Sequence, residues 1–76
     1  MQNKILKFGA KWCKACTALS DLDLKDLRGA ESIDVDSNAE AVKKWQITKL
    51  PTVLIVDGDS VIEKIVGKEE IEERFS

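Results

Sequence analysis

The stretch ILKFGAKWCKACT, residues 5–17, contains both cysteines of the chain, Cys13 and Cys16, with two residues between them. A predicted strand, Lys4 to Phe8, precedes this pair, and Gly9 ends the strand. From Cys13 onward the apolar residues follow a helical period, so the pair lies where a strand passes into a helix. Two thiols at this spacing have three common uses: half of a metal site, inert core packing, or a disulfide that opens and closes.

Composition limits the class of protein. The chain has 76 residues, 43% of them hydrophobic, and we expect one small domain over residues 1–76. Its 12 basic and 14 acidic side chains give a net charge of −2, which provides no general attraction to nucleic acid. The longest aliphatic run, Val53 to Val56, is far too short to span a bilayer. We therefore expect a soluble monomer that binds neither nucleic acid nor membrane.

The first residues, MQNKILKFG, lack the apolar core of a secretory signal, and we expect the protein to be cytoplasmic. Thiols in the cytoplasm are usually kept reduced, so a disulfide there tends to be transient or catalytic. A disulfide that closes so short a loop would also remove little entropy from the unfolded chain. This context favours redox chemistry over a structural staple.

Alternating hydrophobicity and helical periods predict the element order β-α-β-α-β-β-α. The elements are a strand at 4–8, a helix at 13–27 with a break near Ser20 and Asp21, a strand at 32–36 that places Ile33 and Val35 on one face, a helix after Ser37, strands at 53–56 and 61–66, and a last helix with Ile71 and Phe75 on one side.

Two local signals mark boundaries in the second half of the chain. Ser37 and Glu40 form an S-x-x-E pattern, which predicts a capping box at the start of the second helix. Asp57-Gly58 between two apolar runs predicts a tight hairpin turn.

This element order predicts a four-stranded mixed α/β sheet with strand order 2-1-3-4 and helices on both faces. Strands one and two are parallel through a crossover, and strands three and four form an antiparallel hairpin. The cysteine pair then lies at the carboxyl end of the first strand and at the amino end of the first helix. Open α/β sheets place their chemistry at such positions.

Electrostatics at this position favour a reactive thiolate. The helix amino terminus and the flanking Lys11 and Lys14 supply positive potential at Cys13, and the thiolate is the nucleophilic form of cysteine. We expect Cys16, one turn further along, to face the core and to be the less exposed thiol. A closed zinc site is the main alternative, but it usually needs four ligands, and this chain, which has no histidine, would have to dimerise.

The chain resembles thioredoxins over nearly its whole length. The matching residues are the strand ILKF, Ala10, Trp12-Cys13-x-x-Cys16, the loop Leu50-Pro51-Thr52, the hairpin strands, and Val66-Gly67 before the last helix. The resemblance implies that Cys13 attacks, that Cys16 resolves, and that Pro51 is cis and lies against the disulfide. We expect Leu50 and Thr52 to offer backbone groups to a bound substrate strand and Pro51 to shape the groove. Trp12 either packs against one side of the disulfide or contacts the substrate directly.

The resemblance further implies a thiol–disulfide oxidoreductase that needs no metal or organic cofactor. Its substrates would be disulfide-containing proteins, and a thioredoxin reductase or glutathione would recycle it. Two other hypotheses are a glutathione-linked, glutaredoxin-like enzyme and a redox-inactive module that binds proteins through the same surface. Against the former, the residues before the last helix, Gly67-Lys68-Glu69, match the glutathione-binding cluster of glutaredoxins poorly.

Three departures separate the sequence from typical thioredoxins. We expect a minimal, glutaredoxin-sized version without the family's additional N-terminal strand and helix. Lys14-Ala15 replaces the usual Gly-Pro between the cysteines, and Lys7 stands where the family carries a buried acid. The Lys7 side chain either extends to solvent or places its ammonium group near Cys16, where it would favour the thiolate.

Overall fold

The computed structural model describes residues 3–20, 27 and 29–75. Its elements are β1 (Asn3–Gly9), α1 (Lys14–Ser20), β2 (Glu31–Asp34), α2 (Ala39–Lys44), β3 (Thr52–Asp57), β4 (Ser60–Val66) and α3 (Lys68–Phe75). The element order predicted from the sequence is confirmed. The predicted extension of the first helix to Leu27, with a break near Ser20 and Asp21, falls largely on residues 21–26, outside the described part of the chain.

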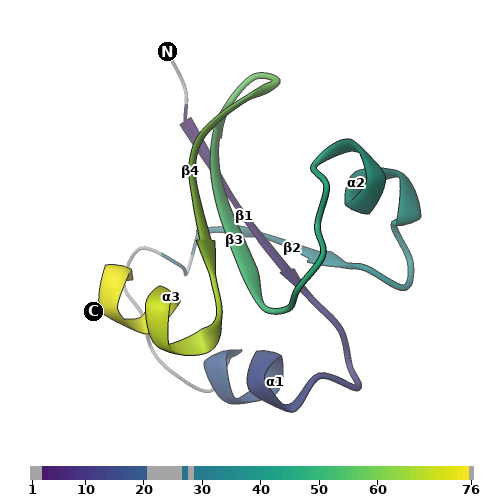
Figure 1. Ribbon diagram of the computed structural model, residues 1–76, viewed down its shortest axis with the longest axis vertical. Helices are drawn as coiled ribbons and strands as arrows, with labels where there is room; N and C mark the ends of the chain where they lie inside the picture. The colour runs from purple at the N-terminus through teal and green to yellow at the C-terminus, as the bar shows by residue number, and fades with distance from the viewer. Residues whose placement is uncertain (1–2, 21–26, 28, 76) are drawn as a thin grey trace.

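The strands form one mixed sheet in the order β2-β1-β3-β4 (Figure 1), as the sequence predicts. β1 pairs with β2 in parallel and with β3 in antiparallel, and β3 and β4 form an antiparallel hairpin. β1 and β3 are therefore the two central strands, and each is hydrogen-bonded on both edges.

Both faces of the sheet are covered, and β1 alternates between the two cores. Leu6 and Phe8 belong to a buried cluster with Ile33, Ile47, Leu54 and Val56, against which α2 packs. On the other face, Ile5 packs against a cluster that joins α1 and α3: Leu19, Val53, Ile65, Ile71 and Phe75. Figure 1 shows α1 and α3 together on one side of the sheet and α2 on the other. Lys7, two residues after Ile5, therefore faces α1.

The hairpin turn lies one residue later than predicted. Asp57 still belongs to β3 and pairs with Ser60, so the turn is formed by Gly58 and Asp59. Gly58 has a φ of 62°. A positive φ at the first of two central positions is what a type II′ turn requires, and glycine adopts it without steric cost.

The second strand is also shorter than predicted, because β2 ends at Asp34. Val35 has left the ladder, and its backbone N–H donates to the Gly9 carbonyl over 3.0 Å. Its side chain still packs against the same cluster as Ile33, so the predicted shared face is retained.

The predicted cap of the second helix is wrong. The N-cap is Asn38, whose side-chain oxygen accepts the backbone N–H of Ala41 over 3.3 Å. The backbone of Ser37 is engaged in the preceding turn, where its N–H donates to the Asp34 carbonyl. With the cap at Asn38, Glu40 lies at the second helical position and not at the third, where a capping box needs it.

No helix within the described ranges has both the length and the apolar character needed to cross a membrane.

Replacing the observed cap should destabilise the protein more than replacing the predicted one. Asn38→Ala removes the acceptor for the Ala41 N–H and should lower the free energy of unfolding by about 1 kcal/mol. Ser37→Ala is the matched control and should change it by less than about 0.5 kcal/mol. Urea denaturation of both variants measures the difference, and an equal or larger loss for Ser37→Ala would contradict this assignment of the cap.

Candidate active site

The two cysteines are held where β1 passes into α1. The chain leaves the sheet at Gly9, turns, and begins α1 at Lys14. The backbone N–H of Cys13 donates to the Ala10 carbonyl over 3.2 Å, which closes the turn. The Cys13 carbonyl then accepts the Thr17 N–H over 3.1 Å, in the spacing of a helix. Cys13 is thus the residue at which turn and helix join.

The two sulfur atoms lie in one small cluster, and both cysteines are free thiols. The backbone N–H of Cys16 donates to Cys13 Sγ over 3.3 Å. A donor aimed at a sulfur stabilises negative charge on it, so this contact favours the nucleophilic form of Cys13.

The prediction that Cys16 would be the less exposed thiol is wrong, because each cysteine is 8% exposed. Ala10 completes the buried cluster, and Val35 and Leu50 pack against it. Val35 directly follows β2, and Leu50 lies in the loop before β3. They cover Cys13 as fully as the core covers Cys16.

Cys16 is a thiol that ionises with difficulty. Burial, followed by the hydrogen bond with Cys13, raises the pKa of Cys16 to about 11. A backbone hydrogen bond from Ala10 and, most weakly, the charge of Lys7 act in the opposite direction and lower this pKa. The ammonium group of Lys7 therefore favours the Cys16 thiolate, as proposed from the sequence, but its effect is smaller than that of burial.

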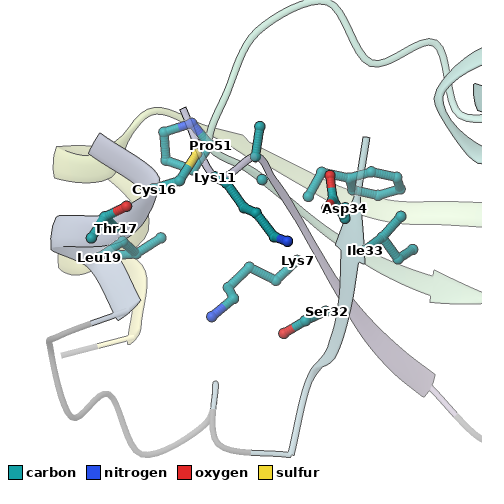
Figure 2. A pocket seen from close by; sticks show the side chains of 12 residues that line it. Lys7, Lys11, Cys16, Thr17, Leu19, Ser32, Ile33, Asp34 and Pro51 are labelled. Carbon is teal, nitrogen blue, oxygen red and sulfur yellow. The ribbon is translucent and has the colours of Figure 1, made fainter. Parts of the chain in front are cut away.

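Lys7 and Cys16 share a pocket of about 310 Å³, which we call the lysine pocket. Its polar lining consists of Lys7, Lys11, Cys16, Thr17, Ser32 and Asp34. The remainder of the lining is Phe8, Gly9, Ala10, Leu19, Ile33 and Pro51. Figure 2 shows the amino groups of Lys7 and Lys11 turned into the open space between α1 and β2. Lys14 is exposed and does not line this pocket.

Cys13 faces a different hollow, of about 300 Å³, which we call the Cys13 groove. It is lined by Trp12, Cys13, Val35, Val42, Ile47, Thr48, Lys49 and Leu50. Trp12 is 67% exposed at its edge, and its indole Nε1–H donates to Asp36 Oδ2 over 2.8 Å. This hydrogen bond holds a large apolar surface beside the Cys13 sulfur.

The loop before β3 completes the surroundings of the cysteines. The Leu50–Pro51 peptide bond is cis, and the Pro51 carbonyl accepts the Gly67 N–H over 2.9 Å. Thr52 is completely buried, and its hydroxyl donates to the Lys49 carbonyl. Its side chain therefore belongs to the interior, whereas no hydrogen bond joins the backbone of Leu50 to another described residue.

Two residues near the site were not singled out from the sequence. Asp36 follows β2, and parallel pairing of β1 with β2 brings it beside the residues that follow β1. Gly9 lies against the resolving thiol, since a Cβ there would be 3.3 Å from Cys16 Cβ. The contact of Asp36 with Trp12 could have been predicted, because both residues follow strands that are parallel neighbours in the predicted sheet. The close approach of Cys16 to Gly9 has no corresponding signal in the sequence.

Within the described residues, no three His, Cys, Asp or Glu side chains are grouped closely enough to hold a metal ion.

The comparison with protein families identifies the arrangement. A family model described as Thioredoxin matches residues 1–75, which include both cysteines and Pro51. The chain belongs to the thioredoxin family. The resemblance inferred from the sequence and the thioredoxin-like fold predicted from it are both confirmed.

Individual thioredoxins are related at low to moderate identity. The chain is 28% identical to thioredoxin H2-2 of Oryza sativa over 95% of its own length and 59% of that protein. It is 32% identical to the thioredoxin of Bacillus subtilis over 79% of its length and 64% of that protein. The thioredoxin structure of Fasciola hepatica is 26% identical, covers 96% of this chain and 75% of its own, and superposes with a TM-score of 0.76. The chain thus spans less than two thirds of both related sequences.

Removing the charge of Lys7 should make Cys16 harder to ionise. In a Cys13→Ser background, where Cys16 alone reacts, Lys7→Met should raise the pKa of Cys16 by about one pH unit or less. This range follows because an opposite charge at close range contributes about 1–3 units, and Lys7 is the weakest influence here. The rate of alkylation as a function of pH measures this pKa.

Lys7→Arg keeps the charge and should restore the original value, while Lys43→Met on α2 should leave it unchanged. A Lys7→Met variant whose Cys16 ionises at the same or a lower pH would show that the ammonium group does not act on this thiol.

Proposed function

We propose that the protein is a dithiol–disulfide oxidoreductase that cycles between the Cys13, Cys16 dithiol and a disulfide between them. The observation that carries the proposal is the contact in which the Cys16 N–H donates to Cys13 Sγ over 3.3 Å, since it places both sulfurs at one helix start. Membership in the thioredoxin family supports the same chemistry.

In the first step, the Cys13 thiolate attacks one sulfur of a substrate disulfide. A bond forms between Cys13 Sγ and that sulfur, the substrate S–S bond breaks, and the other substrate sulfur leaves as a thiolate. Cys13 suits this role because it faces the Cys13 groove and accepts a hydrogen bond that stabilises its negative charge.

In the second step, Cys16 loses its proton and attacks Cys13 Sγ of the mixed disulfide. The intramolecular disulfide forms, and the second substrate sulfur leaves as a thiolate. The substrate gains two electrons, the protein loses two, and the departing thiolates take up protons from Cys16 and from water. The raised pKa of Cys16 makes its deprotonation the difficult part of this step, and Lys7 assists it.

The Cys13 groove is the proposed binding site for the substrate polypeptide. Trp12 supplies an exposed apolar surface, and the Leu50 backbone has no hydrogen bond to another described residue, so it is free to pair with an extended strand. Pro51 and Thr52 follow Leu50 but do not line this groove, since Pro51 lines the lysine pocket and Thr52 is buried and pairs with Phe8 and Val66 in the sheet. Their proposed part is to hold Leu50 in place beside the groove. Disulfide-containing proteins are the substrate class that fits this arrangement.

A thioredoxin reductase is the proposed electron donor, with glutathione as the alternative. The sequence before the last helix disfavours a glutaredoxin-like site, since Gly67-Lys68-Glu69 matches the glutathione-binding cluster of glutaredoxins poorly. Regeneration of the dithiol should be measured with both donors in parallel.

The reducing direction requires a compartment that keeps thiols reduced, and the cytoplasm is the proposed one. We propose that the protein acts there as a monomer.

Trapping separates the attacking thiol from the resolving one. Cys16→Ser should accumulate mixed disulfides with substrate proteins because nothing resolves them, whereas Cys13→Ser should trap almost none. Non-reducing electrophoresis followed by mass spectrometry of the linked cysteine measures both. Equal trapping by the two variants would refute these roles, and full activity of a protein with both cysteines changed to serine would support a redox-inactive binding module instead.

A further inference from the structure

The lysine pocket has the chemistry of an anion-binding site, and the proposed reaction uses it only through Cys16 and Lys7. Its volume of about 310 Å³ lies at the lower end of the range of small-molecule sites, about 300–1,000 Å³. Lys7 is half-buried, whereas Lys11 is exposed at the rim. Among the described residues, neither ammonium group has a hydrogen bond or an ion-pair partner.

The remaining lining decides what kind of anion fits. Leu19 and Pro51 line the pocket on the α1 side, near Cys16, whereas the side chains of the lining residues Phe8 and Ile33 pack into the cluster under α2. Figure 2 shows the Ser32 hydroxyl turned into the same space as the two ammonium groups. The Thr17 hydroxyl is already engaged, since it donates to the Cys13 carbonyl over 3.3 Å. An apolar wall beside a few donors suits a compact organic ligand better than a bare inorganic ion.

Among the described residues of the lining, one acidic group opposes an anion. This group is Asp34, which lines the pocket. Its Oδ1 accepts the Asp36 N–H over 3.0 Å, so one of its two carboxylate oxygens is already engaged by the backbone. Two lysines against one aspartate leave the described lining with an excess of positive charge.

We propose that the lysine pocket binds a small organic carboxylate, with its carboxylate between Lys7 and Lys11 and its apolar body toward Leu19 and Pro51, and that binding slows the resolving step of Cys16. The second half rests on the proposed function. A carboxylate beside Lys7 neutralises the charge that favours the Cys16 thiolate, and it lies next to the sulfur that must move. The pocket thereby becomes a regulatory site on the Cys16 side, separate from the Cys13 groove.

Binding is tested first, on the reduced wild-type protein, without reference to activity. Benzoate is the probe, and benzamide, its neutral counterpart of similar shape, is the control, both at constant pH and ionic strength. Amide chemical shifts should change saturably with benzoate around Lys7, Thr17 and Ser32, and much less with benzamide. Shifts that do not saturate, or that benzamide reproduces, would overturn the proposal.

Variants then locate the site. Lys7→Met and Lys11→Met should each weaken benzoate binding by about tenfold, the loss expected for one charge-assisted contact. Lys43→Met removes an exposed lysine from α2, on the other face of the sheet, and should leave binding unchanged. Lys7→Arg keeps the positive charge and should retain most of the affinity for benzoate. This variant distinguishes loss of the charge from a general effect of substituting residue 7. Equal weakening by Lys43→Met would show nonspecific attraction and overturn the site.

Regulation is tested with dithiodipyridine, an uncharged disulfide that releases one pyridinethione when Cys13 attacks and a second when Cys16 resolves. Saturating benzoate should slow the second release severalfold in the wild type and leave the first unchanged, and it should have little effect in Lys7→Met. Binding without any slowing would overturn the regulatory role. Absence of the second release even without benzoate would instead refute the proposed function, so the two failures are distinguishable.

Discussion

β1 is hydrogen-bonded on both edges and covered on both faces, and this constraint determines how the site is built. A strand so enclosed has one register and one alternation, with Leu6 and Phe8 toward α2 and Lys7 toward α1. The chain must leave the sheet at Gly9, whose missing side chain lets Cys16 approach the backbone closely. The start of α1, and with it the spacing of the two sulfurs, follows from that exit.

The two thiols differ in their surroundings although they are equally exposed. Cys13 accepts a backbone N–H and faces a groove edged by Trp12, whereas Cys16 lies beside Lys7 in a separate pocket. Burial keeps Cys16 protonated near neutral pH, so in the proposed reaction it does not compete with Cys13 for the substrate. The charge of Lys7 offsets part of the effect of burial on the Cys16 pKa. In the proposed reaction, the group that assists the attack by Cys16 therefore lies on the opposite side of the two cysteines from the bound substrate. An anion at Lys7 would act on resolution without blocking access to Cys13.

Much of the fold was predictable because periodicity follows burial directly, as the alternation of β1 and the spacing of Ile71 and Phe75 show. The cap of α2 was not predictable, because Ser37 and Asn38 are both good capping residues and the turn after β2 determines which of them caps the helix. The exposure of Cys13 depends on Leu50, and the Trp12 contact with Asp36 depends on strand order. Such features arise from residues distant in the chain, and no local pattern reports them.

The central claim is that Cys13 and Cys16 form one reversible redox couple. Equilibration of the protein in mixtures of reduced and oxidised dithiothreitol, followed by acid quenching and mass spectrometry of the thiols, tests it most directly. A single transition is expected, in which two electrons are transferred and both thiols disappear together into an intramolecular disulfide. A protein that stays fully reduced across the series, or that forms disulfides only between chains, would contradict it.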